Sequence, residues 1–179
     1  MRKLILQLAV SLDGFIEGPK GEYDWCFTDQ DYGMSDFFKR IDAVFMGRKS
    51  YDLTQAVQSE LPPGFPQLKE YIFSNTLDSV KNGAVLLKGD IKTKVEEIKN
   101  SEGKDIWLFG GAGIISELMN LQLVDELILA VHPVIIGGGT PLFKNINERT
   151  WLNLTDTKTY PNGLLMLTYT LKNNSDMNR

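Results

Sequence analysis

Strand-length apolar segments alternate with amphipathic helical segments along most of this chain of 179 residues. Such alternation is typical of parallel β-strands joined by crossover helices. The predicted strands are Leu4–Val10, Ala43–Met46, Tyr71–Phe73, Ala84–Leu87, Ile106–Phe109 and Val124–Ile136, the last broken at Pro133, and Phe15–Ile16 resumes extended structure. The predicted helices are Ser35–Arg40, a segment that starts after Gly47, a segment from an Asp90 N-cap to about Asn100, and Ile114–Asn120. The sequence therefore predicts an α/β fold.

The pattern changes after the three glycines at 137–139. Trp151–Thr159 and Leu164–Leu171 are β-rich, and the turn that joins them contains Asn162-Gly163, which favours an antiparallel hairpin. Leu61–Pro66 contains three prolines and is predicted to be a loop. With no linker or repeat, we expect one three-layer α/β/α domain over residues 1–172, a mostly parallel mixed sheet with an antiparallel C-terminal hairpin, and a polar tail over 173–179.

The charge balance and the rare residues exclude several functional classes. The net charge of -4 gives no electrostatic footprint for nucleic acid or an anionic membrane. Cys26 and His132 are the only cysteine and histidine, so neither an intrachain disulfide nor a Cys/His zinc site can form, and we expect no metal site. A serine triad would require His132, which we interpret as a hydrogen-bonded structural residue.

The N-terminal segment begins with basic residues, but Gln7 interrupts its apolar run and Asp13 follows soon after. We interpret it as a first strand, not as a signal peptide. No apolar run approaches the ~20 residues needed to cross a bilayer. The expected location is the cytoplasm.

Two turns from a strand into a helix could bind phosphate. In the first, Gly47 permits close approach of a ligand, and Arg48, Lys49 and Ser50 add hydrogen-bond donors at a helix N-terminus. The alternative is an ordinary helix start with solvated basic residues.

The second turn holds three glycines in four residues, Gly110, Gly111 and Gly113, and runs from Phe109 to Ile115. It matches neither the dinucleotide fingerprint nor the P-loop, and the alternative is close packing of a helix on a strand. Because both turns are predicted at the same edge of the sheet, together they favour a dinucleotide site more than either does alone.

The chain as a whole resembles the dihydrofolate-reductase-like superfamily, in particular the reductase domain of the bifunctional deaminase-reductases of riboflavin synthesis and its stand-alone relatives. The resemblance spans nearly the full length. Its motifs are Ser11-Leu12-Asp13-Gly14-Phe15-Ile16, Gly47-Arg48-Lys49-Ser50-Tyr51, Phe73-Ser74-Asn75-Thr76, Phe109-Gly110-Gly111-Ala112-Gly113, Leu123-Val124-Asp125-Glu126-Leu127 and the segment from His132 to Phe143.

The resemblance implies that NADPH lies across the sheet and supplies hydride to a small substrate. The implied cofactor-binding residues are Ala9 and Ile16 at the nicotinamide; Gly47, Arg48, Lys49 and Ser50 at the phosphates; Ser74 and Asn75 near the adenosine ribose and its 2′-phosphate; and Phe109, Gly110, Gly111, Ala112, Gly113, Ile114 and Ile115 around the pyrophosphate. The riboflavin reductases also imply a homodimer, and the long apolar region from Val124 to Ile136 could serve as its interface or as a buried central strand.

The substrate side is less determined. Asp29, Asp31 and Asp36 lie near the position of the folate reductases' catalytic acid, although a helix cap or a solvated helix residue is the simpler interpretation of each. Asp13 and Asp31 are our catalytic candidates, and a turn-forming role is the alternative for Asp13. Candidates to hold a substrate phosphate are Lys20, Arg40 and Lys144.

Trp25, Cys26 and Phe27 fall in the loop expected to cover the substrate, with core packing as the alternative. Two functions remain open. One is an NADPH-dependent reductase acting on a ribosylaminopyrimidine, a pterin or another small heterocycle. The other is a non-catalytic nucleotide-binding or scaffold protein with the same fold.

Overall fold

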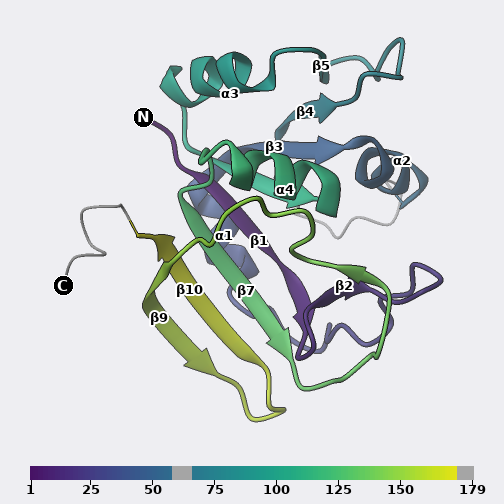
Figure 1. Ribbon diagram of the computed structural model, residues 1–179, viewed down its shortest axis with the longest axis vertical. Helices are drawn as coiled ribbons and strands as arrows, with labels where there is room; N and C mark the ends of the chain where they lie inside the picture. The colour runs from purple at the N-terminus through teal and green to yellow at the C-terminus, as the bar shows by residue number, and fades with distance from the viewer. Residues whose placement is uncertain (58–65, 173–179) are drawn as a thin grey trace.

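The computed structural model describes residues 1–57 and 66–172 (Figure 1). The main sheet contains β1 (Leu4–Ser11), β3 (Ile41–Gly47), β4 (Lys69–Phe73), β5 (Val85–Leu87), β6 (Asp105–Gly110), β7 (Glu126–His132), β9 (Leu152–Thr159) and β10 (Leu165–Leu171). The short strands β2 (Phe15–Glu17) and β8 (Thr140–Pro141) pair separately, and the helices are α1 (Met34–Arg40), α2 (Arg48–Val57), α3 (Ile91–Asn100) and α4 (Ala112–Asn120).

The eight strands lie in the order β5-β4-β3-β6-β1-β7-β10-β9. The first six are mutually parallel, whereas β10 is antiparallel to both β7 and β9. The Tyr160–Gly163 turn joins β9 to β10, and its Gly163 N–H donates to the Tyr160 carbonyl at 2.9 Å. The predicted mixed α/β sheet with a C-terminal antiparallel hairpin is confirmed.

Apolar residues alternate between the two faces of the central strands, and each face is covered by helices. Leu4 and Leu6 pack with α3 and α4 on one face, whereas Ile5, between them, packs with Phe37 of α1 and Tyr51 of α2 on the other. In Figure 1, α4 lies in front of the central strands and α1 behind them. Burial on both faces explains why these strands are continuous apolar runs.

Among the predicted boundaries that differ from the structure, two affect the candidate site or the sheet. β7 is shorter than the predicted 124–136 segment and ends at His132, just before Pro133, which has no N–H to continue the ladder. The glycine turn is also shorter than predicted, because Gly110 still belongs to β6 and α4 already begins at Ala112. Residues 61–65 of the predicted proline loop and the tail at 173–179 lie outside the described residues.

The apolar region around β7 has a local explanation, because this strand is interior to the sheet, between β1 and β10. Its composition therefore gives no independent support for a dimer interface. Within residues 1–57 and 66–172, no helix is both long and apolar enough to span a membrane.

Candidate active site

A cavity of about 760 Å³ opens at the carboxyl edge of the parallel strands. Its size is in the range of small-molecule and cofactor sites. The ends of β1, β3, β4, β5 and β6 contribute to its wall, together with the first turns of α2 and α4. This is the edge at which open α/β sheets bind their ligands.

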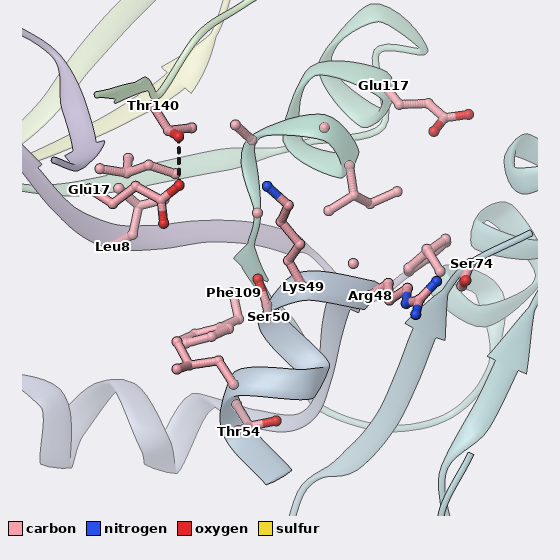
Figure 2. Close-up of a pocket in the computed structure, with 18 of the residues that line it drawn as sticks. Leu8, Glu17, Arg48, Lys49, Ser50, Thr54, Ser74, Phe109, Glu117 and Thr140 are labelled. Atoms are coloured by element: carbon pink, nitrogen blue, oxygen red, sulfur yellow. Dashed lines mark hydrogen bonds between the residues drawn. The ribbon is translucent and has the colours of Figure 1, made fainter. Parts of the chain in front are cut away.

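The strand β3 passes directly into α2 at Gly47-Arg48. The Arg48 side chain donates to the Thr76 hydroxyl at 3.0 Å and lies 3.5 Å from the Asp52 carboxylate. In Figure 2 the Lys49 side chain extends into the middle of the cavity. No carboxylate of the described residues lies within ion-pair distance of Lys49, so this cation is free to meet an anionic ligand.

The turn between β6 and α4 meets the first turn in space. A Cβ atom on Gly47 would lie 3.7 Å from the Gly111 nitrogen, so the two glycine turns are in direct contact. Gly111 is the N-cap of α4 and provides no side-chain hydrogen bond, and a Cβ on Gly113 would have no atom within 4 Å. The first N–H groups of α4 are therefore available to an anion, as are those of α2.

Polar loops after β4 form one end of the cavity. The Ser74 hydroxyl accepts from the backbone N–H groups of Thr76 and Leu77 at 3.2 and 3.1 Å, and the side-chain Oδ1 of Asn75 accepts from Gly89 N–H at 3.2 Å. These bonds fix the loop beside Arg48 (Figure 2). This end therefore combines a guanidinium with several hydroxyl groups.

The opposite end lies at β2 and β8. Glu17 and Thr140 lie beside Leu8, across the cavity from Arg48 and Ser74 (Figure 2). The Thr140 hydroxyl donates to the Glu17 carboxylate at 2.5 Å. The site is thus cationic at one end and carries a carboxylate at the other.

The structure brings most of the predicted cofactor residues to this cavity. Ala9, Ile16, Gly47, Arg48, Lys49, Ser50, Ser74, Asn75, Phe109, Gly111, Ala112, Gly113 and Ile114 line it. Gly110 and Ile115 do not; Ile115 is fully buried in the core. For all of these residues, contact with a cofactor remains a prediction.

Neither predicted catalytic carboxylate lines the cavity. Asp13 accepts hydrogen bonds from the Ser11 hydroxyl and from the backbone N–H groups of Ile136 and Gly137, at 2.7, 3.1 and 2.8 Å. The Ser11 bond, with these backbone donors, lowers the pKa of Asp13. Asp13 is therefore placed to hold two loops together as a carboxylate, and the protonated form that a proton donor must first adopt would weaken those bonds.

Asp31 is exposed and caps the start of α1. Its carboxylate accepts from the Ser35 hydroxyl at 2.7 Å and from the Ser35 and Gly33 N–H groups. The hydrogen bond from Ser35 is the main cause of its lowered pKa. Of its neighbours, Asp29 bonds the Tyr32 hydroxyl and Asp36 pairs with Lys39 at 2.7 Å, and neither lines the cavity.

The three cationic residues that were candidates to hold a substrate phosphate lie in different parts of the structure. Arg40 pairs with Glu126 at 3.0 Å and Asp105 at 3.5 Å, at the amino ends of β7 and β6 and therefore at the far edge of the sheet. Lys20 is exposed in the β2 loop and does not line the cavity. Lys144 does line it.

In the covering loop, Cys26 lines the cavity, and burial raises the pKa of its thiol to about 11. Trp25 and Phe27 instead pack against the ring of His132, with centroids 5.3 and 5.0 Å away. His132 accepts from Phe27 N–H at 3.1 Å through Nε2, and Nδ1 lies 2.9 Å from the Ala130 carbonyl, the arrangement of a structural histidine. Among the described residues, no cluster of histidine, cysteine and carboxylate side chains could hold a metal ion.

Our sequence analysis did not single out Glu17, Thr140, Leu8 or Glu117, which also line the cavity. One available signal was the predicted extended pair Phe15–Ile16, because it places Glu17 at the end of the same segment as the cofactor candidate Ile16. Nothing local indicates that Thr140 pairs with this segment, since their contact joins residues far apart in the sequence.

Comparison with known proteins decides the family. The model of the RibD C-terminal domain matches residues 2–166. The chain belongs to the RibD C-terminal domain family. It is 42% identical over 177 residues to the uncharacterized protein YyaP of Bacillus subtilis (strain 168), covering 94% of each chain.

Two solved structures support the fold of this RibD C-terminal family member. A putative riboflavin biosynthesis protein from Shewanella sp. PV-4 superposes with a TM-score of 0.84 at 26% identity, covering 96% of this chain and 99% of the other. Dihydrofolate reductase from Enterococcus faecalis, complexed with NADP(H), gives a TM-score of 0.64 at 17% identity and covers 96% and 97%. The predicted dihydrofolate-reductase-like fold is confirmed.

Proposed function

We propose that this protein is an NADPH-dependent reductase that transfers hydride to a small heterocycle of the ribosylaminopyrimidine or pterin class. The observation that carries the proposal is the contact between the Gly47 and Gly111 turns, which directs the N-termini of α2 and α4 into one cavity. Membership of the RibD C-terminal domain family and the NADP(H) of the E. faecalis enzyme point to the same cofactor.

The residues of the cavity fit NADPH. Gly47, Gly111 and Gly113 leave space where side chains would otherwise fill the cradle, and the helix N-termini provide N–H donors to a pyrophosphate. Arg48 and the hydroxyls around Ser74 suit a 2′-phosphate. When bound, NADPH supplies the hydride and the chain supplies its position.

The remaining residues of the cavity would position the nicotinamide, the cofactor phosphates and the substrate. Ala9 and Ile16 line the cavity and are the sequence neighbours of Leu8 and Glu17, so the nicotinamide and the substrate would meet at this end. Lys49 extends toward the centre and would lie beside the cofactor phosphates (Figure 2). Lys144 is the cationic candidate placed to attract an anionic substituent of the substrate.

A second candidate function, nucleotide binding without turnover, is supported by the state of the two predicted catalytic carboxylates. Asp13 and Asp31 have lowered pKa values and hydrogen bonds that stabilise the carboxylate, so neither is suited to donate a proton at neutral pH. A nucleotide-binding protein without turnover would need no such donor. We also propose the homodimer that the family resemblance implies.

The test is NADPH consumption by the full chain with a panel of dihydropteridines, ribosylaminopyrimidines and quinoid compounds. A reductase consumes NADPH with at least one compound, and the Lys49→Ala variant loses most of that rate, whereas Lys92→Ala on the exposed side of α3 does not. Tight NADPH binding without consumption of any compound would favour the non-catalytic alternative.

A further inference from the structure

The carboxylate of Glu17 is the acidic group that faces the cavity at its nicotinamide end, and it has a defined position. Glu17 ends β2 and is half-buried, and β2 pairs with Thr140 of β8. A Cβ on Gly139 would lie only 2.0 Å from the Glu17 carbonyl oxygen, so the two segments approach as closely as the backbone allows. β2 and the segment Gly139–Thr140 therefore form one corner of the cavity, in which each segment fixes the position of the other.

The hydrogen bonding of this corner determines what it can bind. The Thr140 hydroxyl donates its only proton to one oxygen of Glu17, at 2.5 Å. The Thr140 hydroxyl can therefore only accept a hydrogen bond from a ligand, and it cannot donate one. The second oxygen of Glu17 has no hydrogen-bond partner among the described residues, and Glu17 is one of the residues that line the cavity.

Glu17 and Thr140 thus present acceptors and no donor to the cavity. A ligand that offers N–H groups here forms charge-assisted hydrogen bonds, whereas a ligand that offers a carbonyl oxygen meets a carboxylate with no proton between them. A site built in this way discriminates strongly against an isosteric analogue without the N–H groups.

We propose that Glu17, oriented by Thr140, selects substrates by the N–H edge of an amino-substituted heterocycle. This inference rests on the proposed function and narrows its substrate to rings that carry such an edge. Glu17 is a recognition residue that contacts the substrate, and Thr140 is a positioning residue that acts through it.

Pterin and lumazine are the probes, because they share a ring system and pterin carries an amino group where lumazine carries an oxo group. Each is titrated by its own fluorescence into the full chain saturated with NADP⁺. We expect the wild type to bind pterin about tenfold or more tightly than lumazine, the scale of one hydrogen bond to a charged group. NADPH affinity is measured separately for every variant.

Glu17→Gln keeps the shape of the side chain but replaces one acceptor oxygen with a donor. It should bring the ratio of the two dissociation constants to about one and leave NADPH affinity unchanged. Thr140→Val should lower the ratio partially because the carboxylate loses its orientation. Glu22→Gln is the control, since it makes the same charge change in the loop that follows β2, outside the cavity, and should keep the ratio.

Equal binding of the two probes by the wild type, or an unchanged ratio in Glu17→Gln, overturns the inference. Binding of neither probe at millimolar concentration to a protein that binds NADPH also overturns it, while the proposed cofactor survives. If the wild type does not bind NADPH, the proposed function itself fails, and the inference fails with it.

Discussion

Replacing Gly113 with alanine should raise the stability of the fold while it weakens NADPH binding. Gly113 is the second residue of α4, has an ordinary helical conformation and lines the cavity. A Cβ there would meet no protein atom within 4 Å, so the folded state accommodates the methyl group without strain. The same methyl group would occupy space that the proposal assigns to the pyrophosphate.

The two effects can be estimated separately. Alanine is preferred over glycine within a helix by about 0.5–1 kcal/mol, and 1 kcal/mol corresponds to roughly 2–4 °C in Tm for a chain of this size. We therefore expect Tm to rise by about 1–4 °C. A methyl group forced against a bound pyrophosphate costs about 1–3 kcal/mol, which corresponds to a loss of affinity of roughly 5–150-fold.

Scanning calorimetry without ligand and an NADPH titration measure the two quantities on the same sample. The test is specific because Tm should rise while NADPH affinity falls, whereas a damaged fold would lower both. A Gly113→Ala protein with raised Tm and unchanged NADPH affinity would refute the placement of the pyrophosphate on this turn.

Two further predictions come from the same structure, and a third comes from the family resemblance. Gly137→Ala, at φ +78° with open space, should cost about 1–2 kcal/mol, which corresponds to roughly 2–8 °C in Tm. Gly139→Ala should lower Tm clearly further, because φ is +129° and the new Cβ would lie 2.0 Å from a backbone oxygen; equal losses would contradict the clash. The single imidazole, His132, should titrate by NMR below its ordinary pKa of 6.5 because burial lowers that pKa. The unfolded state then binds the proton more tightly, so stability should fall as the pH drops below 6.5, and a normal or raised pKa would contradict this environment. Light scattering of the full chain should give twice the monomer mass of 20.2 kDa, and a monomer at micromolar concentration would refute the homodimer.

The strands could be predicted from sequence because burial on both faces leaves a clear local signal. Leu4, Ile5 and Leu6 are all apolar since each packs on one of two cores. The strand order carries no such signal. β6 lies between β3 and β1, which brings the Gly47 turn against the Gly111 turn, and only the folded chain shows that contact.

The part of the candidate site that consists of adjacent residues could be predicted from the sequence. The part that is brought together from distant segments could not. Arg48, Lys49 and Ser50 are adjacent in the sequence and their placement at a helix start is local. The carboxylate near the substrate was sought at Asp13 and among residues 29–36, whereas Asp13 bonds the backbone at 136–137, Asp31 caps α1 and Glu17 lines the cavity. The position of Glu17 depends on the pairing of β2 with β8, and the glycines before Thr140 resemble a flexible turn when read alone.

The most direct test of the central claim is a calorimetric titration of the full chain with NADPH, with NADH in parallel. The account predicts saturable binding of one NADPH per chain, tighter than NADH because Arg48 and the Ser74 loop meet the 2′-phosphate, and a loss of that preference in Arg48→Ala. No saturable binding of either dinucleotide at millimolar concentration would contradict the account.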